Sequence, residues 1–109
     1  MRNSNFIIDS DSYKSSHFLQ YPAGTQYISS YIESRKGGKW DETVFFGLQY
    51  FLIEYLTKPI TMYDIDEAEE LITAHGEPFN RAGWEYIVNK YDGRLPIMIE
   101  AVKEGMVLP

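Results

Sequence analysis

The sequence of 109 residues contains no cysteine, so a disulfide framework and a thiolate metal site are both excluded. Its first residues also lack the basic segment followed by an apolar run of about 7 to 15 residues that marks a secretion signal. For the same reason we expect no insertion into a membrane. A cytoplasmic location is therefore the expectation.

Positive charge is scarce. Ten Lys and Arg residues stand against sixteen Asp and Glu residues, and the resulting net charge of −6 disfavours a general nucleic-acid-binding protein. Residues 1–40 carry five basic and three acidic side chains, whereas residues 41–109 carry five basic and thirteen acidic ones. An anionic small molecule would therefore be repelled least by the first 40 residues, although a plain solvated surface often shows a difference of this size.

Motifs for the common chemistries are also missing. The sequence has no glycine-rich phosphate loop of either common form and no nucleophile elbow. A calcium loop beginning at Asp9 would need an oxygen ligand at its fifth position and glycine at its sixth, but Tyr13 and Lys14 stand there. Neither His17 nor His75 has a partner at metal-ligand spacing. The sequence therefore predicts no metal site and no catalytic residue.

The apolar content is enough for one globular domain. Hydrophobic residues make up 44% of the chain and aromatic residues 16%, so residues 1–109 are expected to form a single domain. Periodicity and caps predict helices from Ser10 or Asp11 to about Tyr21, from 41 to 56, from the Thr61 to Asp64 capping box to Gly76, and from the Asn80 cap to Gly93. Strands are predicted at residues 26–34, 97–102 and from 106 onward. We therefore expect an α+β fold, with about four helices packed on a small antiparallel or mixed sheet.

The predicted helix at residues 41–56 has apolar side chains on nearly every face. Such a helix must be buried nearly all round, and a chain of this length offers few elements to cover it. We therefore expect a partner surface, from a dimer mate or from a further domain. The last predicted strand stops at Pro109, and an unfinished hairpin exposes edge backbone groups. We interpret the chain as the first segment of something longer.

Three side chains near the start of the chain are suited to a ligand. Tyr13 offers a flat ring for stacking on an aromatic ligand, Arg35 offers a planar fork for phosphate, and Asp11 adds a carboxylate on the first turn of the predicted helix. Tyr13, His17 and Tyr21 follow one another at helical spacing, so they should share a face. The alternatives are a half-buried packing tyrosine and a surface cation at a strand end, and spacing alone favours these alternatives.

Several separate stretches resemble the N-terminal region of the nicotinamide phosphoribosyltransferase family, a group of type II phosphoribosyltransferases. These stretches are Asp-Ser-Tyr-Lys at 11–14, Asp-Glu-Thr-Val-Phe-Phe-Gly-Leu-Gln-Tyr at 41–50, Gly-Trp-Glu-Tyr-Ile at 83–87, Lys-Tyr-Asp-Gly-Arg-Leu-Pro-Ile at 90–97 and Ala-Val-Lys-Glu-Gly-Met-Val-Leu-Pro at 101–109. The resemblance runs from about Ile8 to Pro109 in one register, with small gaps around residues 37–40. Because it rests on separate blocks, it does not depend on any one motif.

The resemblance implies an enzyme of NAD biosynthesis that joins nicotinamide to the ribose of phosphoribosyl pyrophosphate, giving nicotinamide mononucleotide and pyrophosphate. It also implies magnesium, ATP hydrolysis coupled through a phosphorylated histidine, and a homodimer whose two sites are each built from both chains. By resemblance, Tyr13 stacks on the nicotinamide ring from the neighbouring subunit, and Asp11 lies at the mouth of that site. Arg35 likewise contacts phosphates across the interface. These are substrate-binding roles, and none is catalytic.

The remaining site residues of the family lie downstream, in a catalytic barrel domain that is absent from this chain. Neither His17 nor His75 is therefore expected to be the phosphorylated histidine. We expect the chain to be the N-terminal domain, or a truncated copy, of a nicotinamide phosphoribosyltransferase, to bind no cofactor by itself, and to be inactive alone. Two alternatives stay open: a nicotinate-specific relative, and a stand-alone non-enzymatic interaction module that self-associates or binds a full-length phosphoribosyltransferase.

Overall fold

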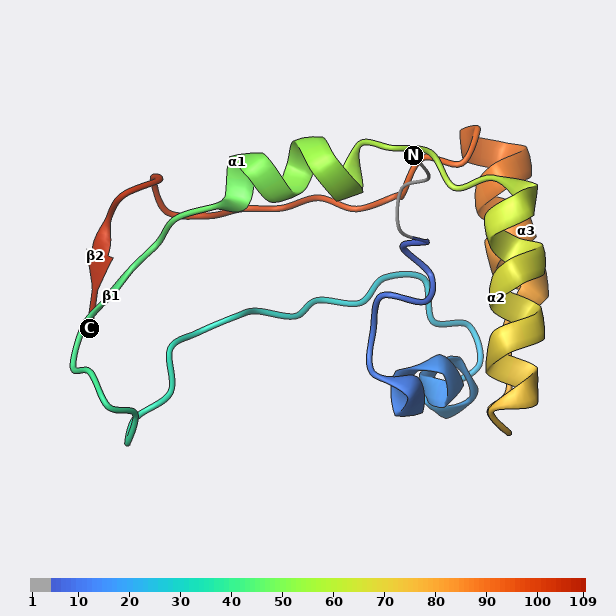
Figure 1. Ribbon diagram of the computed structural model, residues 1–109, viewed down its shortest axis with the longest axis horizontal. Coiled ribbons are helices and arrows are strands. Elements are labelled where there is room, and N and C mark those ends of the chain that lie inside the picture. The colour runs from blue at the N-terminus through green and yellow to red at the C-terminus, as the bar shows by residue number, and fades with distance from the viewer. Residues whose placement is uncertain (1–4) are drawn as a thin grey trace.

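The computed structural model describes residues 5–109 (Figure 1). In chain order the elements are η1 (Ser12–Gln20), β1 (Thr43–Val44), α1 (Leu48–Phe51), η2 (Leu52–Leu56), α2 (Met62–Ala74), α3 (Arg81–Tyr91) and β2 (Val107–Leu108). The first, η1, is a 3₁₀-helix, and α1 runs directly into the π-helical turn η2, so the two form one short helix. Helices α2 and α3 lie side by side at one end of the molecule, and β1 pairs with β2 at the other (Figure 1). The predicted α+β class is confirmed.

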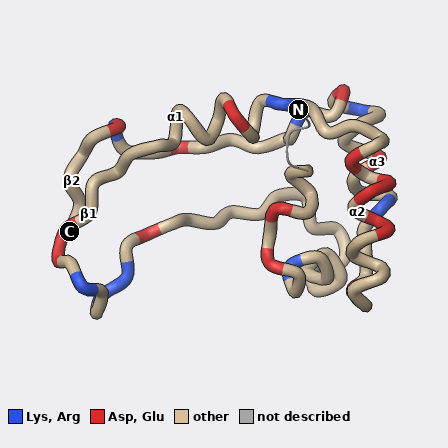
Figure 2. Tube along the Cα trace, in the orientation of Figure 1, with Lys and Arg blue, Asp and Glu red and all other residues tan. Residues whose placement is uncertain are grey.

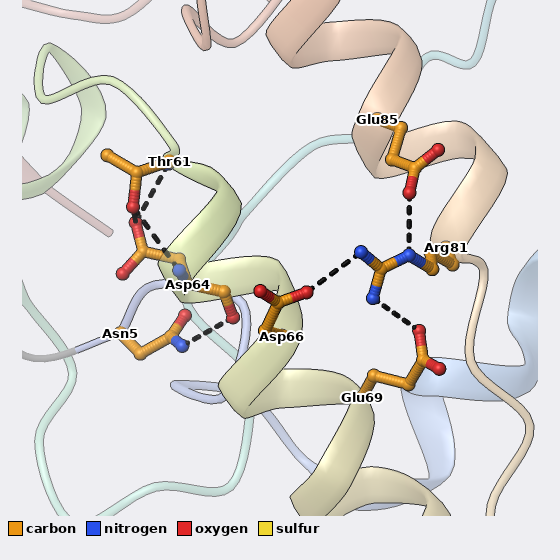
Figure 3. Close-up of polar contacts among 7 residues, drawn as sticks. All are labelled: Asn5, Thr61, Asp64, Asp66, Glu69, Arg81 and Glu85. Carbon is orange, nitrogen blue, oxygen red and sulfur yellow. Dashed lines mark hydrogen bonds and ion pairs between the residues drawn. The ribbon is translucent and has the colours of Figure 1, made fainter.

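The core lies where the N-terminal segment meets α2 and α3. Its buried apolar residues are Ile7, Ile60, Ile65 and Ala68, and the partly buried residues packed against them are Phe6, Ile8, Ile72, Phe79, Trp84, Val88 and Leu95. Asn5 joins the N-terminal segment to α2, because its Nδ2 donates to the backbone oxygen of Asp64 at 2.8 Å (Figure 3). The same Nδ2 donates to the carboxylate of Glu67 at 3.2 Å. These bonds satisfy an amide that is only 5% exposed.

Local capping sets the ends of α2 and α3, as the sequence predicts. The Asp64 N–H donates to the Thr61 hydroxyl, and the Asp64 carboxylate accepts from the Thr61 N–H, which completes the capping box (Figure 3). The Asn80 side chain accepts from the Gly83 N–H at 3.1 Å at the start of α3. Gly93 follows α3 with a φ of 81°, a conformation that glycine adopts without strain.

Arg81, the first residue of α3, connects that helix to the acidic face of α2. Its Nη1 donates to Glu69 at 2.8 Å, its Nη2 to Asp66 at 2.8 Å and its Nε to Glu85 at 2.6 Å (Figure 3). Hydrogen bonds to Glu69, Asp66 and Glu85 raise the pKa of the Arg81 guanidinium above its ordinary value. Because these side chains are partly exposed, solvent screens each pair, and their main effect is to fix how the two helices sit together.

Two of the three predicted strands are wrong. Residues 26–34 and 97–102 form no strand, and among the described residues no backbone hydrogen bond joins 26–34 to another segment. A strand needs a neighbour for its N–H and C=O groups, and 26–34 runs apart from the other segments (Figure 1). Among the described residues, no backbone hydrogen bond joins residues 97–102 to a distant segment either.

The third predicted strand, from 106 onward, is confirmed as β2, but its partner was not foreseen. Thr43 pairs with Leu108 and Val44 with Val107, in antiparallel register. With these few pairings the chain is open in shape. Its Cα radius of gyration is 16.4 Å, against about 13 Å for a compact domain of this length.

The helix predicted at 41–56 begins later in the structure than the sequence indicates. Residues 43–44 belong to β1, and the helix begins only at Leu48, after Gly47 with a φ of 104°. The N–H groups of Gly47 and Gln49 each donate to the Glu104 carboxylate at 2.9 Å. A distant side chain thus satisfies donors at the start of this helix, a role that local sequence does not reveal.

Glu104 makes the stability of this end of the molecule dependent on pH. Backbone hydrogen bonds from Gln49 and Gly47 lower the pKa of the Glu104 carboxyl below its ordinary value. Because the pKa is lower in the folded than in the unfolded chain, ionised Glu104 adds stability above the ordinary glutamate pKa, and this contribution is lost as the pH falls through the lower, folded-state value. We therefore expect Glu104→Gln to remove that acid transition, because an amide does not titrate there. The variant should also weaken both hydrogen bonds, because its single oxygen accepts poorly from two N–H groups at once.

The measurement is the amide proton shift and exchange rate of Gly47 and Gln49 across that pH range. Glu100→Gln, in the same exposed segment, is the matched control and should leave both amides unchanged. Equal effects of the two variants would contradict the assignment.

Candidate functional site

The segment that carries Asp11 and Tyr13 is the 3₁₀-helix η1. Hydroxyl groups support this tighter winding, since Ser15 Oγ donates to the backbone oxygen of Ser12 at 2.9 Å and Ser16 Oγ to that of Tyr13 at 3.0 Å. Asp11 occupies the N-cap position, but its side chain accepts no capping hydrogen bond. The helix therefore starts where the sequence predicts, but the side-chain capping hydrogen bond expected there is not formed.

The Tyr13 side chain is exposed, and its ring has one aromatic neighbour in the described chain. The residue is 57% exposed. The His17 ring lies 5.4 Å away between centroids, at an interplanar angle of 67°, which is an edge-to-face contact. The predicted shared face is thus correct for Tyr13 and His17, whereas Tyr21 is the C-cap residue and stands outside the helix.

Asp11 and Lys14 complete the surroundings of the Tyr13 ring. Lys14 Nζ lies 5.9 Å from the ring centroid, within reach of a cation–π contact. The same Nζ lies 3.5 Å from Asp11 Oδ2, and both side chains are half exposed or more. The Asp11 carboxylate, predicted to face a ligand, thus contacts Lys14 beside the Tyr13 ring. Because this ion pair is exposed, it contributes little to stability.

Arg35 is not brought together with Tyr13 and Asp11 in this chain. It lies in the basic loop at residues 35–39, beside the paired strands and at the opposite end of the molecule from α2 and α3 (Figure 2). The extended residues 26–35 that lead to it span up to about 33 Å. Among residues 5–109 no carboxylate is paired with Arg35, which leaves its guanidinium fork exposed to solvent.

A shallow surface groove lies elsewhere, between α2 and α3. Its volume is about 490 Å³, and it is lined by Asp66, Glu69, Glu70, Thr73, Ala74 and Arg81. The carboxylates of Asp66 and Glu69 are held by Arg81, so the groove presents an ion-pair network and no activated nucleophile. Sequence reasoning missed Arg81, although a basic residue just after the Asn80 cap, with acidic residues at helical spacing on α2, is a usable signal.

Residues 5–109 contain neither a metal-binding cluster nor a membrane-spanning helix. Within residues 5–109, no group of three or more His, Asp or Glu side chains is placed to hold a metal ion. None of the helices there has the length and apolar character that crossing a bilayer requires. The candidate site therefore consists of two separate parts, the exposed ring on η1 and the basic loop at residues 35–39.

Comparison with known sequences gives two findings. Residues 5–99 match the family described as the N-terminal domain of nicotinamide phosphoribosyltransferase. The nicotinamide phosphoribosyltransferase of Xanthomonas campestris pv. campestris (strain 8004) is 55% identical over 105 residues, which cover 96% of this chain and 22% of that relative. The chain thus spans about a fifth of the length of the curated relative that it matches.

Proposed function

The chain belongs to the family of nicotinamide phosphoribosyltransferase N-terminal domains, and from this membership we propose that it works as the N-terminal part of such an enzyme in NAD biosynthesis. In the proposed reaction the ring nitrogen of nicotinamide forms a bond to the anomeric carbon of phosphoribosyl pyrophosphate. The bond from that carbon to pyrophosphate breaks, so the products are nicotinamide mononucleotide and pyrophosphate. The observation that carries the proposal is the family match over residues 5–99.

Within this function we assign substrate contacts to three residues. The Tyr13 ring is exposed and flat, which suits stacking on nicotinamide. Arg35 has an exposed guanidinium fork in a basic loop, which suits the phosphates of phosphoribosyl pyrophosphate. Asp11 contacts Lys14, whose amine lies near the Tyr13 ring. We therefore assign the Asp11 carboxylate to the mouth of the nicotinamide site. Electrostatic catalysis would come from residues outside this chain, so the chain alone is proposed to be inactive.

The separation of η1 from the basic loop favours a site that is completed by other segments. The segment η1 and the basic loop at residues 35–39 lie apart in this conformation (Figures 1 and 2). A homodimer with sites built from both chains would complete such a site, because η1 and the basic loop of one subunit could both reach across the interface to the catalytic barrel domain of the other. The exposed apolar side chains Tyr27, Ile32 and Phe46 are consistent with such burial against a partner.

Magnesium and ATP are implied by the family for the full enzyme, but residues 5–109 do not supply the set of side-chain ligands that a magnesium site built by this chain would need. No group of three or more His, Asp or Glu side chains in the described residues is placed to hold a metal ion. We therefore derive no step through magnesium or ATP from this chain. Its part is to orient nicotinamide and to hold phosphate groups.

We expect Tyr13→Ala to weaken nicotinamide binding about tenfold in a full-length enzyme that carries this chain as its N-terminal region. The loss is on the order of 1 kcal/mol, from the missing aromatic pairing and some lost burial of the ligand. Tyr13→Phe should be much milder, because the ring face is kept. The measurement is the KM for nicotinamide, at saturating phosphoribosyl pyrophosphate.

Arg35→Lys is the matched comparison for the other substrate. It should raise the KM for phosphoribosyl pyrophosphate more than that for nicotinamide, because a point charge replaces a bidentate fork. For the shared-site proposal, mixing a Tyr13→Ala subunit with a subunit disabled downstream should restore one working site per mixed dimer. Confirmed mixed dimers without activity would return Tyr13 to the role of a packing residue.

A further inference from the structure

The Tyr13 ring is exposed, but it contacts another side chain of its own helix. Its edge-to-face contact with His17 is the one ring contact that Tyr13 makes among residues 5–109. His17 is itself only partly exposed, so it is the better anchored of the two rings. The exposed Tyr13 ring thus packs against a histidine of the same helix.

The backbone between the two rings is held as well. Ser16, the residue before His17, donates from its hydroxyl to the backbone oxygen of Tyr13 at 3.0 Å. On the other side, Lys14 places its amine 5.9 Å from the Tyr13 ring centroid and is drawn toward Asp11 at 3.5 Å. The His17 ring and the Lys14 amine therefore limit the directions in which the Tyr13 ring can turn.

We propose that His17 is a positioning residue that holds the Tyr13 ring in the orientation in which it stacks on nicotinamide. The inference rests on the proposed function, because it needs Tyr13 to be the stacking residue. A ring that is already oriented loses less conformational freedom when the ligand binds, so preorganisation appears as tighter binding. Edge-to-face contact needs a ring and not an ionisable nitrogen, so a phenyl ring in place of the imidazole retains the effect.

This role differs from the chemistry usually associated with histidine. A general acid, a general base or a phosphoryl acceptor would lose its function in His17→Phe, because the ring nitrogens are gone. A ring that only positions Tyr13 would lose its function in His17→Ala and His17→Leu, and it would keep its function in His17→Phe. The two classes of role therefore predict opposite results for the phenylalanine variant.

The test uses the full-length enzyme and measures kcat and both KM values. We expect His17→Ala and His17→Leu to raise the KM for nicotinamide about threefold to fivefold, with kcat and the KM for phosphoribosyl pyrophosphate unchanged within twofold. His17→Phe should return the KM for nicotinamide to within twofold of the original. His75→Ala removes the other histidine, the exposed C-cap residue of α2, and should change none of these values.

A double-mutant cycle makes the test specific to the ring contact. In a Tyr13→Ala background, His17→Ala should cause little further increase in the KM for nicotinamide, because there is no ring left to hold. Additive effects, or loss of kcat in His17→Phe, would overturn the proposal. If Tyr13→Ala alone raises this KM and His17→Ala and His17→Leu do not, the inference fails while the proposed function stands. If Tyr13→Ala has no effect on nicotinamide, the stacking role of Tyr13 fails, and the inference fails with it.

Discussion

Replacing Gly93 with alanine is expected to destabilise the folded chain by roughly 3–5 kcal/mol. Gly93 is buried, has a φ of 81° and accepts a hydrogen bond from the Ile60 N–H at 2.8 Å. A Cβ added there would be in hard contact with the backbone oxygen of Ile60 and 2.9 Å from its nitrogen. Backbone atoms cannot move aside as a flexible side chain can. The connection between the start of α2 and the end of α3 would have to shift.

Gly76→Ala is the matched control, because it introduces the backbone strain without the steric clash that an alanine at Gly93 would cause. Gly76 has a φ of 89°, but an added Cβ would meet nothing within 4 Å. Its cost should therefore be the left-handed strain alone, about 1–2 kcal/mol. Urea unfolding of the two variants, followed by circular dichroism and tryptophan fluorescence, gives the comparison. Equal losses in both variants would mean that the contact between Gly93 and Ile60 carries no weight.

Ile65→Ala is expected to cost roughly 2–4 kcal/mol, because it leaves a cavity in the middle of the core. Ile65 is fully buried on α2, between the N-terminal segment and α3. A loss of this size should lower the Tm by about 10 °C or more in a chain of this length. The measurement is thermal unfolding by circular dichroism.

Leu71→Ala is the matched control on the same helix. Leu71 is 51% exposed, so its truncation removes little buried area and should cost less than about 1 kcal/mol. If the two variants were destabilised alike, the core would not be centred on Ile65.

The features that the sequence predicted correctly depend on residues close together in the chain. The capping box at Thr61, the cap at Asn80 and the glycine after α3 each involve positions at most a few residues apart. The contact between Tyr13 and His17 is also local, although the four-residue spacing that predicted it assumes an α-helix and η1 is a 3₁₀-helix. Such features can be predicted without knowing the rest of the fold.

The features that the sequence did not predict depend on distant residues. Alternation at 26–34 is typical of a strand, but no segment in the described chain lies beside it to pair with. The start of the helix near Leu48 is set by Gly47 and by Glu104, which is more than fifty residues away. For the site, the separation of η1 from the loop that carries Arg35 cannot be derived from spacing. The contact of Asp11 with Lys14 is local, at i and i+3, and the sequence analysis overlooked it.

The pairing of β1 with β2 also differs from the packing of α2 and α3 in its contact order. Residues 75–80 are all that separates the two helices, so bringing them together closes a short loop. The strands pair residues from opposite ends of a much longer stretch, and the entropic cost of closing a loop rises with its length. Two residue pairs, the backbone hydrogen bonds of Phe45 with Gly105 and Met106, and the Glu104 contacts must offset that larger cost. The helical end of the molecule is thus a local structure, whereas its strand end depends on ordering the whole intervening chain.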